Sequence, residues 1–168
     1  MIKNYVLTTI PTMSKEFFIS LEFKAIQYIG GHFQSVIHFT KDGDNGVGNR
    51  IPALWVYHDG QLYPRFAVNG NGDFGIRTTK KYPLNQWIKV QFSQTLEYGK
   101  YIYRVLIDGK NEIEVENSQA KAFSNVKVYV GDEWYPSLKG SIRNLFVNAD
   151  GSNPCGGKFK TRQSTFLL

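Results

Sequence analysis

The stretch Trp87-Ile-Lys-Val-Gln-Phe-Ser-Gln94, followed by Tyr101-Ile-Tyr-Arg-Val-Leu-Ile-Asp-Gly-Lys110, decides the fold class of this chain. In the first segment, apolar residues alternate with Lys, Gln and Ser, which is the period of a strand with one buried and one wet face. The second segment ends at Asp108-Gly109, which suits a type I′ hairpin turn because both central residues need a positive φ. The sequence therefore predicts antiparallel β structure.

The same alternation continues on both sides of this stretch. Residues 16–25 have the longest alternating pattern, and Asp59-Gly60 between residues 53–58 and 62–68 is a second hairpin signal. The other predicted strands cover residues 33–40, 74–78, 112–116, 126–130 and 142–147. Helix is expected only as a single turn near Ala120 to Ser124. These short strands and their turns predict an all-β fold, an antiparallel jelly-roll β-sandwich.

Length and composition predict one domain. With 168 residues, 42% of them hydrophobic, the chain is long enough for one core and too short for two comfortable ones. We expect residues 1–149 to form the sandwich and residues 150–168, where Gly, Ser and basic side chains are frequent, to form a partly mobile tail. Cys155 is the single cysteine, so we expect a free thiol, or else a disulfide to another chain.

The charge and the apolar segments narrow the class of partner. A net charge of +6 favours polyanions such as sulfated glycans, anionic membranes or nucleic acid. Nucleic acid is not the predicted partner, because Lys and Arg are scattered between strands and no nucleic-acid motif accompanies them. The sequence has no stretch of about 18 apolar residues that would predict a transmembrane helix. Its first residues also lack the apolar run of a signal peptide.

A family resemblance rests on four segments in a fixed order. They are Trp87-x-Lys-Val, Tyr101-x-Tyr-x-Val-x-Ile-Asp-Gly, Phe123-x-Asn-Val-Lys-Val-Tyr-Val-Gly-Asp132 and Gly140-x-Ile-Arg-Asn-Leu145. Together they resemble the concanavalin A-like lectin and glucanase superfamily, and within it the laminin G-like modules of extracellular and adhesion proteins. The resemblance covers residues 4–148 and implies a concanavalin A-like sandwich, an extracellular location and a role in recognition. That fold hosts lectins, adhesion modules, glycosidases and lyases, so it leaves the ligand open.

A second resemblance is to the galectins, which share this fold. The segments Ile37-His-Phe39 and Asn49-Arg50 are similar to the galectin strand that carries the sugar-binding His, Asn and Arg. Trp87 is followed by Ile-Lys-Val, where the galectin tryptophan is followed by glycine, glutamate and arginine. A galectin-like lectin, cytoplasmic or exported by an unconventional route, is therefore an alternative.

Two further segments allow a polysaccharide-active enzyme. Glu112, Glu114 and Glu116 alternate along one strand face, which resembles the catalytic strand of retaining glucanases, whose two carboxylates lie about 5–5.5 Å apart. A solvated strand face explains the same pattern. Ser35-Val-Ile-His38 resembles the histidine strand of alginate lyase-like enzymes, in which a Gln and a His act with a Tyr. His38 equally fits an ordinary strand histidine.

A carbohydrate-binding surface is expected around the strand that follows the long polar loop. Aromatic faces stack on the C–H bonds of a sugar, while guanidinium groups bind its hydroxyl, carboxylate or sulfate oxygens. The candidate ligand-binding residues are Arg50, Trp55, Tyr57, His58, Arg65, Arg77 and His38. Trp55 has the alternative of a core position, because Leu54 and Val56 cannot share its face.

Two loops supply oxygen ligands for calcium. Calcium takes six to eight oxygens from carboxylates, amides and backbone carbonyls, and a jelly roll can bring two such loops to one rim. The candidate ligands are Asp42, Asp44, Asn45, Asn71 and Asp73. Asp, Asn and Gly are also the usual turn residues, so plain turns are the alternative.

Together these features predict a non-catalytic recognition module that binds a glycan, acidic and sulfated glycans included, or an extracellular protein. The alternatives are a glucanase or lyase and the galectin-like lectin. Exposed edge strands also allow a homodimer.

Overall fold

The alternating segments form strands in a computed structural model that describes residues 4–41, 43, 46–151 and 166–167. The strands in this part of the chain are β1 (Val6–Met13), β2 (Phe17–Gln27), β3 (Gln34–Thr40), β4 (Ala53–Val56), β5 (Leu62–Val68), β6 (Asn71–Gly75), β7 (Ile88–Glu97), β8 (Lys100–Ile107), β9 (Lys110–Glu116), β10 (Phe123–Tyr129), β11 (Lys139–Asn148) and β12 (Phe166–Leu167).

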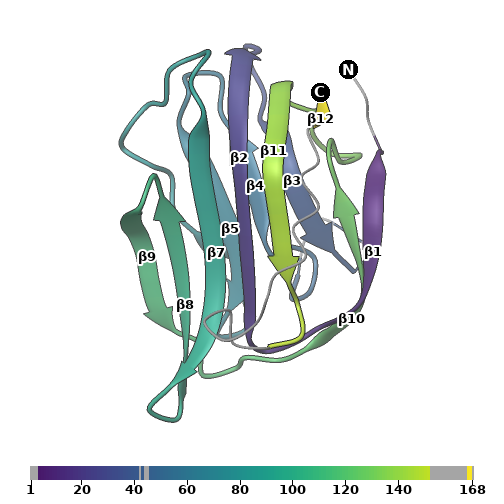
Figure 1. Ribbon diagram of the computed structural model, residues 1–168, viewed down its shortest axis with the longest axis vertical. Coiled ribbons are helices and arrows are strands. Elements are labelled where there is room, and N and C mark those ends of the chain that lie inside the picture. Colours follow the sequence, from purple (N-terminus) through teal and green to yellow (C-terminus); the bar gives the residue numbers. More distant parts are fainter. Residues whose placement is uncertain (1–3, 42, 44–45, 152–165, 168) are drawn as a thin grey trace.

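Two antiparallel sheets pack face to face (Figure 1). The first sheet has the order β1-β10-β3-β4-β5-β6, and the second has the order β12-β11-β2-β7-β8-β9. Strands distant in the sequence, such as β2 and β11, are neighbours in a sheet, as in a jelly roll. The all-β, antiparallel jelly-roll sandwich predicted from the sequence is confirmed.

The core lies between the sheets and is built from alternate residues of each strand. On β2, Phe17, Ile19, Leu21 and Phe23 are buried, while the residues between them are only partly buried. Burying such apolar side chains stabilises a fold by roughly 25 cal/mol per Å² removed from water. The register of each strand is therefore set by which set of alternate side chains is apolar.

The hairpin signals lie where turns form. Asp108 and Gly109 have φ values of 50° and 80°, as a type I′ turn between β8 and β9 requires. Asp59-Gly60 lies in the turn between β4 and β5, where the Gly60 amide donates to the Tyr57 carbonyl over 2.9 Å. Both hairpin predictions are confirmed.

The structure differs from the sequence prediction in three elements. The helical turn expected near Ala120 to Ser124 is wrong, because Phe123 begins β10, whose Val126 and Val128 are needed in the core. The strand expected at residues 74–78 lies earlier, at Asn71–Gly75, and β1 had not been predicted. Within the expected tail, Phe166–Leu167 pairs with Ser141–Ile142 of β11, while Cys155 lies outside the described residues.

Candidate functional site

The outer face of the first sheet, which points away from the core, is built from alternate residues of three strands. Cross-strand neighbours share a face, and the register places His38 opposite Ala53, Ala53 opposite Arg65, and Trp55 opposite Tyr63. These side chains therefore lie together on this outer face. The short alternating segments of β4 and β5 thus position most of the candidate site.

Five aromatic side chains gather on this face. We call them the aromatic cluster; they are Phe33, Trp55, Tyr57, Tyr63 and Tyr135. The ring of Phe33 lies in the middle, with its centroid 4.5 Å from that of Tyr63, 5.1 Å from that of Tyr57 and 5.5 Å from that of Tyr135. Trp55 and Tyr63 are buried, whereas Phe33, Tyr57 and Tyr135 are half-buried. The face therefore presents three partly accessible rings on a packed aromatic base.

Three arginines lie over rings of the aromatic cluster. Such cation–π contacts hold the guanidinium in place and leave the N–H groups at its edge available for hydrogen bonds. The Cζ-to-centroid distances are 5.0 Å for Arg50 over Trp55, 5.4 Å for Arg65 over Tyr63, 5.1 Å for Arg77 over Tyr57 and 5.5 Å for Arg77 over Tyr63. Donors and apolar rings are thereby combined on one surface.

Arg50 and Arg65 are held by one carboxylate. Both contact Oδ1 of Asp73 on β6, with Arg65 Nε 3.1 Å away, and Arg65 Nη1 also donates to the Ile76 carbonyl over 2.9 Å. Burial lowers the pKa of Arg65, and the Asp73 charge opposes that effect. The side chains of Arg50 and Arg65 are only 8% and 18% exposed, so both guanidiniums are largely enclosed.

His38 lies on the same face but beneath its surface. Its Nδ1 is 3.2 Å from Oδ2 of Asp132, and its Nε2 contacts the carbonyl oxygen of Asn49. Trp55 Nε1 donates to the same Asp132 oxygen over 3.2 Å, and the Trp134 ring lies 5.4 Å from the imidazole. Because His38 and Asp132 are fully buried, this group supports Trp55 from below.

Asp132 is ionised in this setting. Burial raises the pKa of its carboxyl, but hydrogen bonds from His38, the Tyr135 amide and the Trp55 indole outweigh burial, so its pKa falls below the ordinary value. The other oxygen, Oδ1, accepts from the amides of Trp134 and Tyr135 over 3.1 and 2.7 Å. The carboxylate therefore ties the segment after β10 to the outer face.

The structure brings the candidate ligand-binding residues onto one face, at different depths. His38, Arg50 and Trp55 are buried; Arg65 and Tyr57 are half-buried; His58 and Arg77 are exposed.

Five residues of this face were not predicted from the sequence: Phe33, Tyr63, Asp132, Trp134 and Tyr135. Tyr63 could have been found, because it lies two residues before Arg65 and so on the same strand face. The others come from segments between strands and carry no periodic signal.

The expected calcium ligands are only partly described. Asp42, Asp44 and Asn45 lie outside the described residues. Asn71 Oδ1 accepts the Asp73 amide over 2.9 Å, and the Asp73 carboxylate contacts two guanidiniums, whose charge opposes a cation at that oxygen. In the described part of the chain, no three His, Cys, Asp or Glu side chains form a group that could hold a metal. The calcium site stays a prediction.

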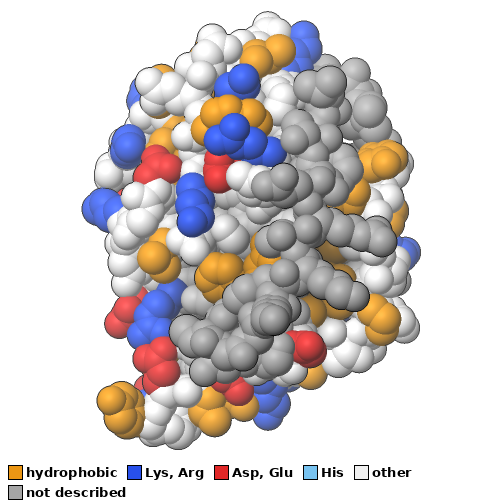
Figure 2. All heavy atoms as spheres, viewed as in Figure 1, with side chains coloured by type: hydrophobic (Ala, Val, Ile, Leu, Met, Phe, Trp, Pro, Cys, Tyr) orange, Lys and Arg blue, Asp and Glu red, His pale blue; other side chains and the backbone are white. Residues whose placement is uncertain are grey.

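The glutamates of β9 lie at the edge of the second sheet. Glu112 is 2.9 Å from Lys110 Nζ, Glu114 is 2.8 Å from Arg104 Nε, and Glu116 is 2.7 Å from Lys100 Nζ. Figure 2 views the outer face of this sheet, where Lys and Arg side chains lie next to Asp and Glu side chains. Each of the three carboxylates thus has a cationic partner; Glu114 and Glu116 are exposed, whereas Glu112 is half-buried.

Trp87 also lies on the second sheet. Its ring contacts Lys24 Nζ at 5.0 Å and Arg143 Cζ at 3.9 Å, measured to the ring centroid. Trp87 is therefore not part of the aromatic cluster, whose tryptophan is Trp55. A galectin-type site, with this tryptophan beside His38 and Arg50, is not assembled here.

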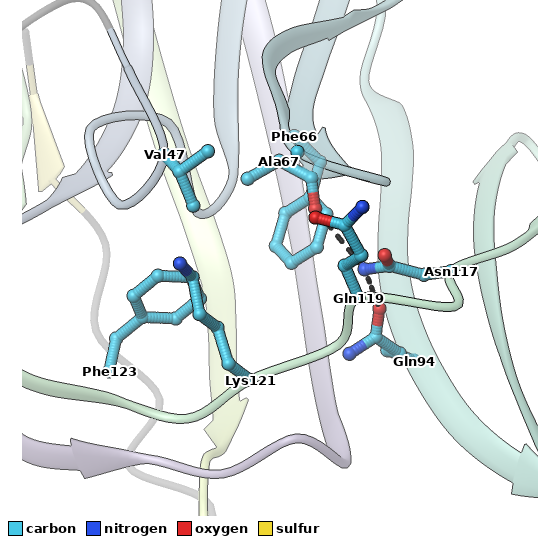
Figure 3. A pocket seen from close by; sticks show the side chains of 9 residues that line it. Val47, Phe66, Ala67, Gln94, Asn117, Gln119, Lys121 and Phe123 are labelled. Atoms are coloured by element: carbon cyan, nitrogen blue, oxygen red, sulfur yellow. Dashed lines mark hydrogen bonds between the residues drawn. The ribbon is translucent and has the colours of Figure 1, made fainter.

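A pocket of about 20 Å³ lies at one end of the sandwich (Figure 3). Its lining includes Val47, Phe66, Gln94, Asn117, Lys121 and Phe123. Asn117 Nδ2 donates to Gln94 Oε1 over 2.8 Å and to the Ala67 carbonyl over 3.2 Å, so these polar groups already have partners. A volume of this size holds about one water molecule. The outer face of the first sheet is the better candidate site.

Comparison with known proteins supports the fold. No protein-family model and no curated protein sequence matches this chain. Among solved structures, a heptameric SAP-like pentraxin from Limulus polyphemus has a TM-score of 0.56 and 18% identity, covering 84% of this chain and 67% of that chain. A doubly substituted variant of human galectin-16 has a TM-score of 0.52 and 13% identity, with 89% of this chain and 99% of that chain covered.

A third similar structure is the CBM40 of a Ruminococcus gnavus IT-sialidase, bound to α2,3 sialyllactose. Its TM-score is 0.51 at 11% identity, and the match covers 87% of this chain and 89% of that chain. The TM-scores indicate a shared fold, and identities this low leave the ligand open. In the part of the chain that the structure describes, no helix is long and apolar enough to cross a membrane. This chain has the jelly-roll sandwich fold of the concanavalin A-like lectins.

Proposed function

We propose that this chain is a non-catalytic carbohydrate-recognition module that binds its glycan on the outer face of the first sheet. The observation that carries this proposal is the aromatic cluster with Arg77 at its surface. The half-buried rings of Phe33, Tyr57 and Tyr135 offer apolar faces for the C–H side of a sugar ring. Arg77 offers edge donors to sugar oxygens beside those rings.

The fold is consistent with this function. The Ruminococcus gnavus CBM40 that shares it was solved with sialyllactose, so one protein of this architecture binds a glycan. We further propose that the module works outside the cell, as part of an adhesion or glycan-binding protein of the laminin G-like kind. A protein ligand is the alternative occupant of the same face.

The enzyme alternatives have less support in the geometry. The β9 glutamates that a glucanase would use lie on the other sheet and each contacts a Lys or Arg. His38, which a lyase would use, is fully buried against Asp132. Neither group is presented on the aromatic surface where a sugar would lie.

A glycan array tests the proposal, with product analysis on the glycans that bind. The wild-type chain should bind at least one glycan class without cleaving it, and Tyr57→Ala should weaken that binding because its ring is half-buried beside Phe33 and Arg77. Trp87→Ala is the matched control, since it removes a half-buried ring on the second sheet. Equal losses in both variants, or new reducing ends or unsaturated products, would refute the proposal.

Calcium and self-association remain proposals that the same protein can test. We propose that the predicted ligands, Asn71 and Asp73 among them, bind a calcium ion; chelation with EDTA should then lower the melting temperature. In the described part of the chain, β1, β6 and β9 are edge strands that offer sites for pairing between copies, and Pro11 removes one backbone donor from β1. Analytical ultracentrifugation distinguishes monomer from dimer.

A further inference from the structure

Arg77 differs from the other two arginines of the site in its exposure. Its side chain is 47% exposed, against 8% for Arg50 and 18% for Arg65. Arg50 and Arg65 are enclosed and share Asp73, so their role is to hold the rings of Trp55 and Tyr63. A ligand approaching from solvent reaches Arg77 first.

Arg77 is also held in a fixed position before any ligand arrives. Its guanidinium lies over the rings of Tyr57 and Tyr63, its Nε donates to Gln61 Oε1, and its Nη2 is 3.3 Å from Asp59 Oδ2. Contacts from several directions reduce the side-chain entropy that binding would otherwise cost. The guanidinium is therefore preorganised as well as accessible.

A second cation shares the carboxylate of Asp59. Lys81 Nζ lies 3.5 Å from Asp59 Oδ2, the same oxygen that faces Arg77, and the Lys81 side chain is 64% exposed. Burial raises the pKa of Asp59, but the Gln61 amide and the charges of Lys81 and Arg77 outweigh it and lower the pKa. Asp59 is thus a single negative charge between two positive ones, and the group keeps a net positive charge.

This cationic group adjoins the aromatic surface directly. Tyr57, which lies under Arg77, also contacts Phe33 and the exposed ring of His58, the latter at 4.1 Å between centroids. A sugar ring resting on Tyr57 and Phe33 would place a substituent on one side within reach of Arg77 and Lys81. A planar guanidinium next to an ammonium group fits an anionic substituent better than a hydroxyl.

We infer that the glycan bound on this face is acidic, with its anionic group, a carboxylate or a sulfate ester, bound by Arg77 and Lys81 while its ring lies on Tyr57 and Phe33. This inference rests on the proposed function and specifies its substrate class. It assigns charge recognition to Arg77 and Lys81 and leaves Arg50 and Arg65 as positioning residues.

The test compares acidic oligosaccharides with neutral ones on the same backbone by isothermal titration calorimetry. The probes are hexagalacturonate with its methyl ester, sialyllactose with lactose, and dextran sulfate with dextran. At least one acidic member should bind about tenfold more tightly than its neutral partner, and that preference should shrink as the ionic strength is raised above about 0.15 M. The first two pairs report a carboxylate, and the third a sulfate.

Variants assign the effect to this group. Arg77→Gln and Lys81→Gln should each remove most of the preference for the acidic member, and Arg77→Lys should restore part of it, because the charge returns without the planar fork. Lys80→Gln is the matched control: this neighbour is 61% exposed, contacts Asp108 at 4.0 Å and lies over Tyr82. Thermal unfolding of each variant confirms that it is folded.

The outcomes separate the two proposals. If neutral and acidic oligosaccharides bind equally, or if Lys80→Gln lowers affinity as much as Arg77→Gln, the inference of an acidic ligand is overturned while the carbohydrate-binding function stands. If no glycan binds in the array, the proposed function fails, and this inference fails with it.

Discussion

Nδ1 of His38 lies 3.2 Å from Oδ2 of Asp132, although 94 residues separate them in the chain. The contact joins β3 to the segment after β10, and the same oxygen of Asp132 receives the indole N–H of Trp55. A carboxylate this deeply buried is favourable only because other hydrogen bonds also satisfy it. Here the Trp134 and Tyr135 amides supply them, so the outer face of the first sheet depends on this one side chain.

Replacing Asp132 should therefore destabilise the fold in a pH-dependent way. Asp132→Ala leaves the His38 imidazole and the Trp55 indole N–H buried without this acceptor, and near neutral pH it should lower the free energy of unfolding by about 1–3 kcal/mol for each group left unpaired. The folded-state pKa of Asp132 is lower than its ordinary value of 3.8. The carboxylate therefore stabilises the fold above about pH 3.8 and ceases to do so as the pH falls through its lower folded-state pKa.

Urea unfolding of both proteins across the acid range measures this effect. The difference between wild type and Asp132→Ala should narrow as the pH falls below 3.8. Glu133→Ala, a change at the exposed neighbouring residue, should leave stability nearly unchanged. A difference that stays constant down to strongly acid pH would show that the carboxylate charge has no part in it.

The carboxyl group of Glu97 should titrate at unusually low pH. Hydrogen bonds from Arg104 and Thr95 lower its pKa to about 2, from an ordinary value of 4.5. The lowered pKa means that its contribution to stability is present above pH 4.5 and is lost as the pH falls toward 2. An NMR titration of the side-chain carboxyl carbon measures this pKa.

Removal of Arg104 tests the cause. In Arg104→Gln the pKa of Glu97 should rise toward 4.5. Arg143→Gln is the matched control, because Arg143 pairs with Glu22 on the same sheet and should raise only the pKa of Glu22. A wild-type Glu97 that already titrates near 4.5 would contradict the prediction.

Replacing Tyr103 by Phe should stabilise the protein. The Tyr103 ring stacks on Phe66 in the core, with centroids 4.4 Å apart, but its hydroxyl has no hydrogen-bond partner among the described residues. An unpartnered buried hydroxyl costs about 1–3 kcal/mol, so Tyr103→Phe should raise the free energy of unfolding by about 1 kcal/mol. Tyr28→Phe should do the opposite, because the Tyr28 hydroxyl donates to the Tyr82 carbonyl over 2.7 Å. Equal destabilisation in both variants would refute this account.

Tyr98 carries a backbone cost that asparagine would reduce. It lies in the turn between β7 and β8 with φ at 50°, followed by Gly99 at 80°, and its side chain is fully exposed. A left-handed backbone costs an L-residue roughly 1–2 kcal/mol, and asparagine tolerates it better than tyrosine. Tyr98→Asn should therefore raise the melting temperature. Asp108→Asn, in the corresponding turn before β9, is the control and should change it little; a lower melting temperature for Tyr98→Asn would show that the ring makes stabilising contacts.

The outcomes at individual residues show which kinds of sequence signal were informative. Alternation over residues 16–25 and 87–94 predicted β2 and β7, because period two decides which side chains enter the core. β1 was missed: only one residue of Val6–Met13 is buried, so the strand has little apolar alternation to recognise. The glutamates of β9 alternate as a catalytic strand would, and their Lys and Arg partners on neighbouring residues and strands became visible only in the fold.

By itself, the sequence determined the all-β class and the hairpin turns, because strand periodicity and turn chemistry are local properties. Only the tertiary structure decided that Phe33 and Tyr135 complete the aromatic cluster, that Asp132 lies beneath Trp55, and that Arg77 is more exposed than Arg50 and Arg65. The physical reason is that burial and charge pairing depend on neighbours brought together by long-range strand pairing, and such neighbours leave no periodic trace in the chain.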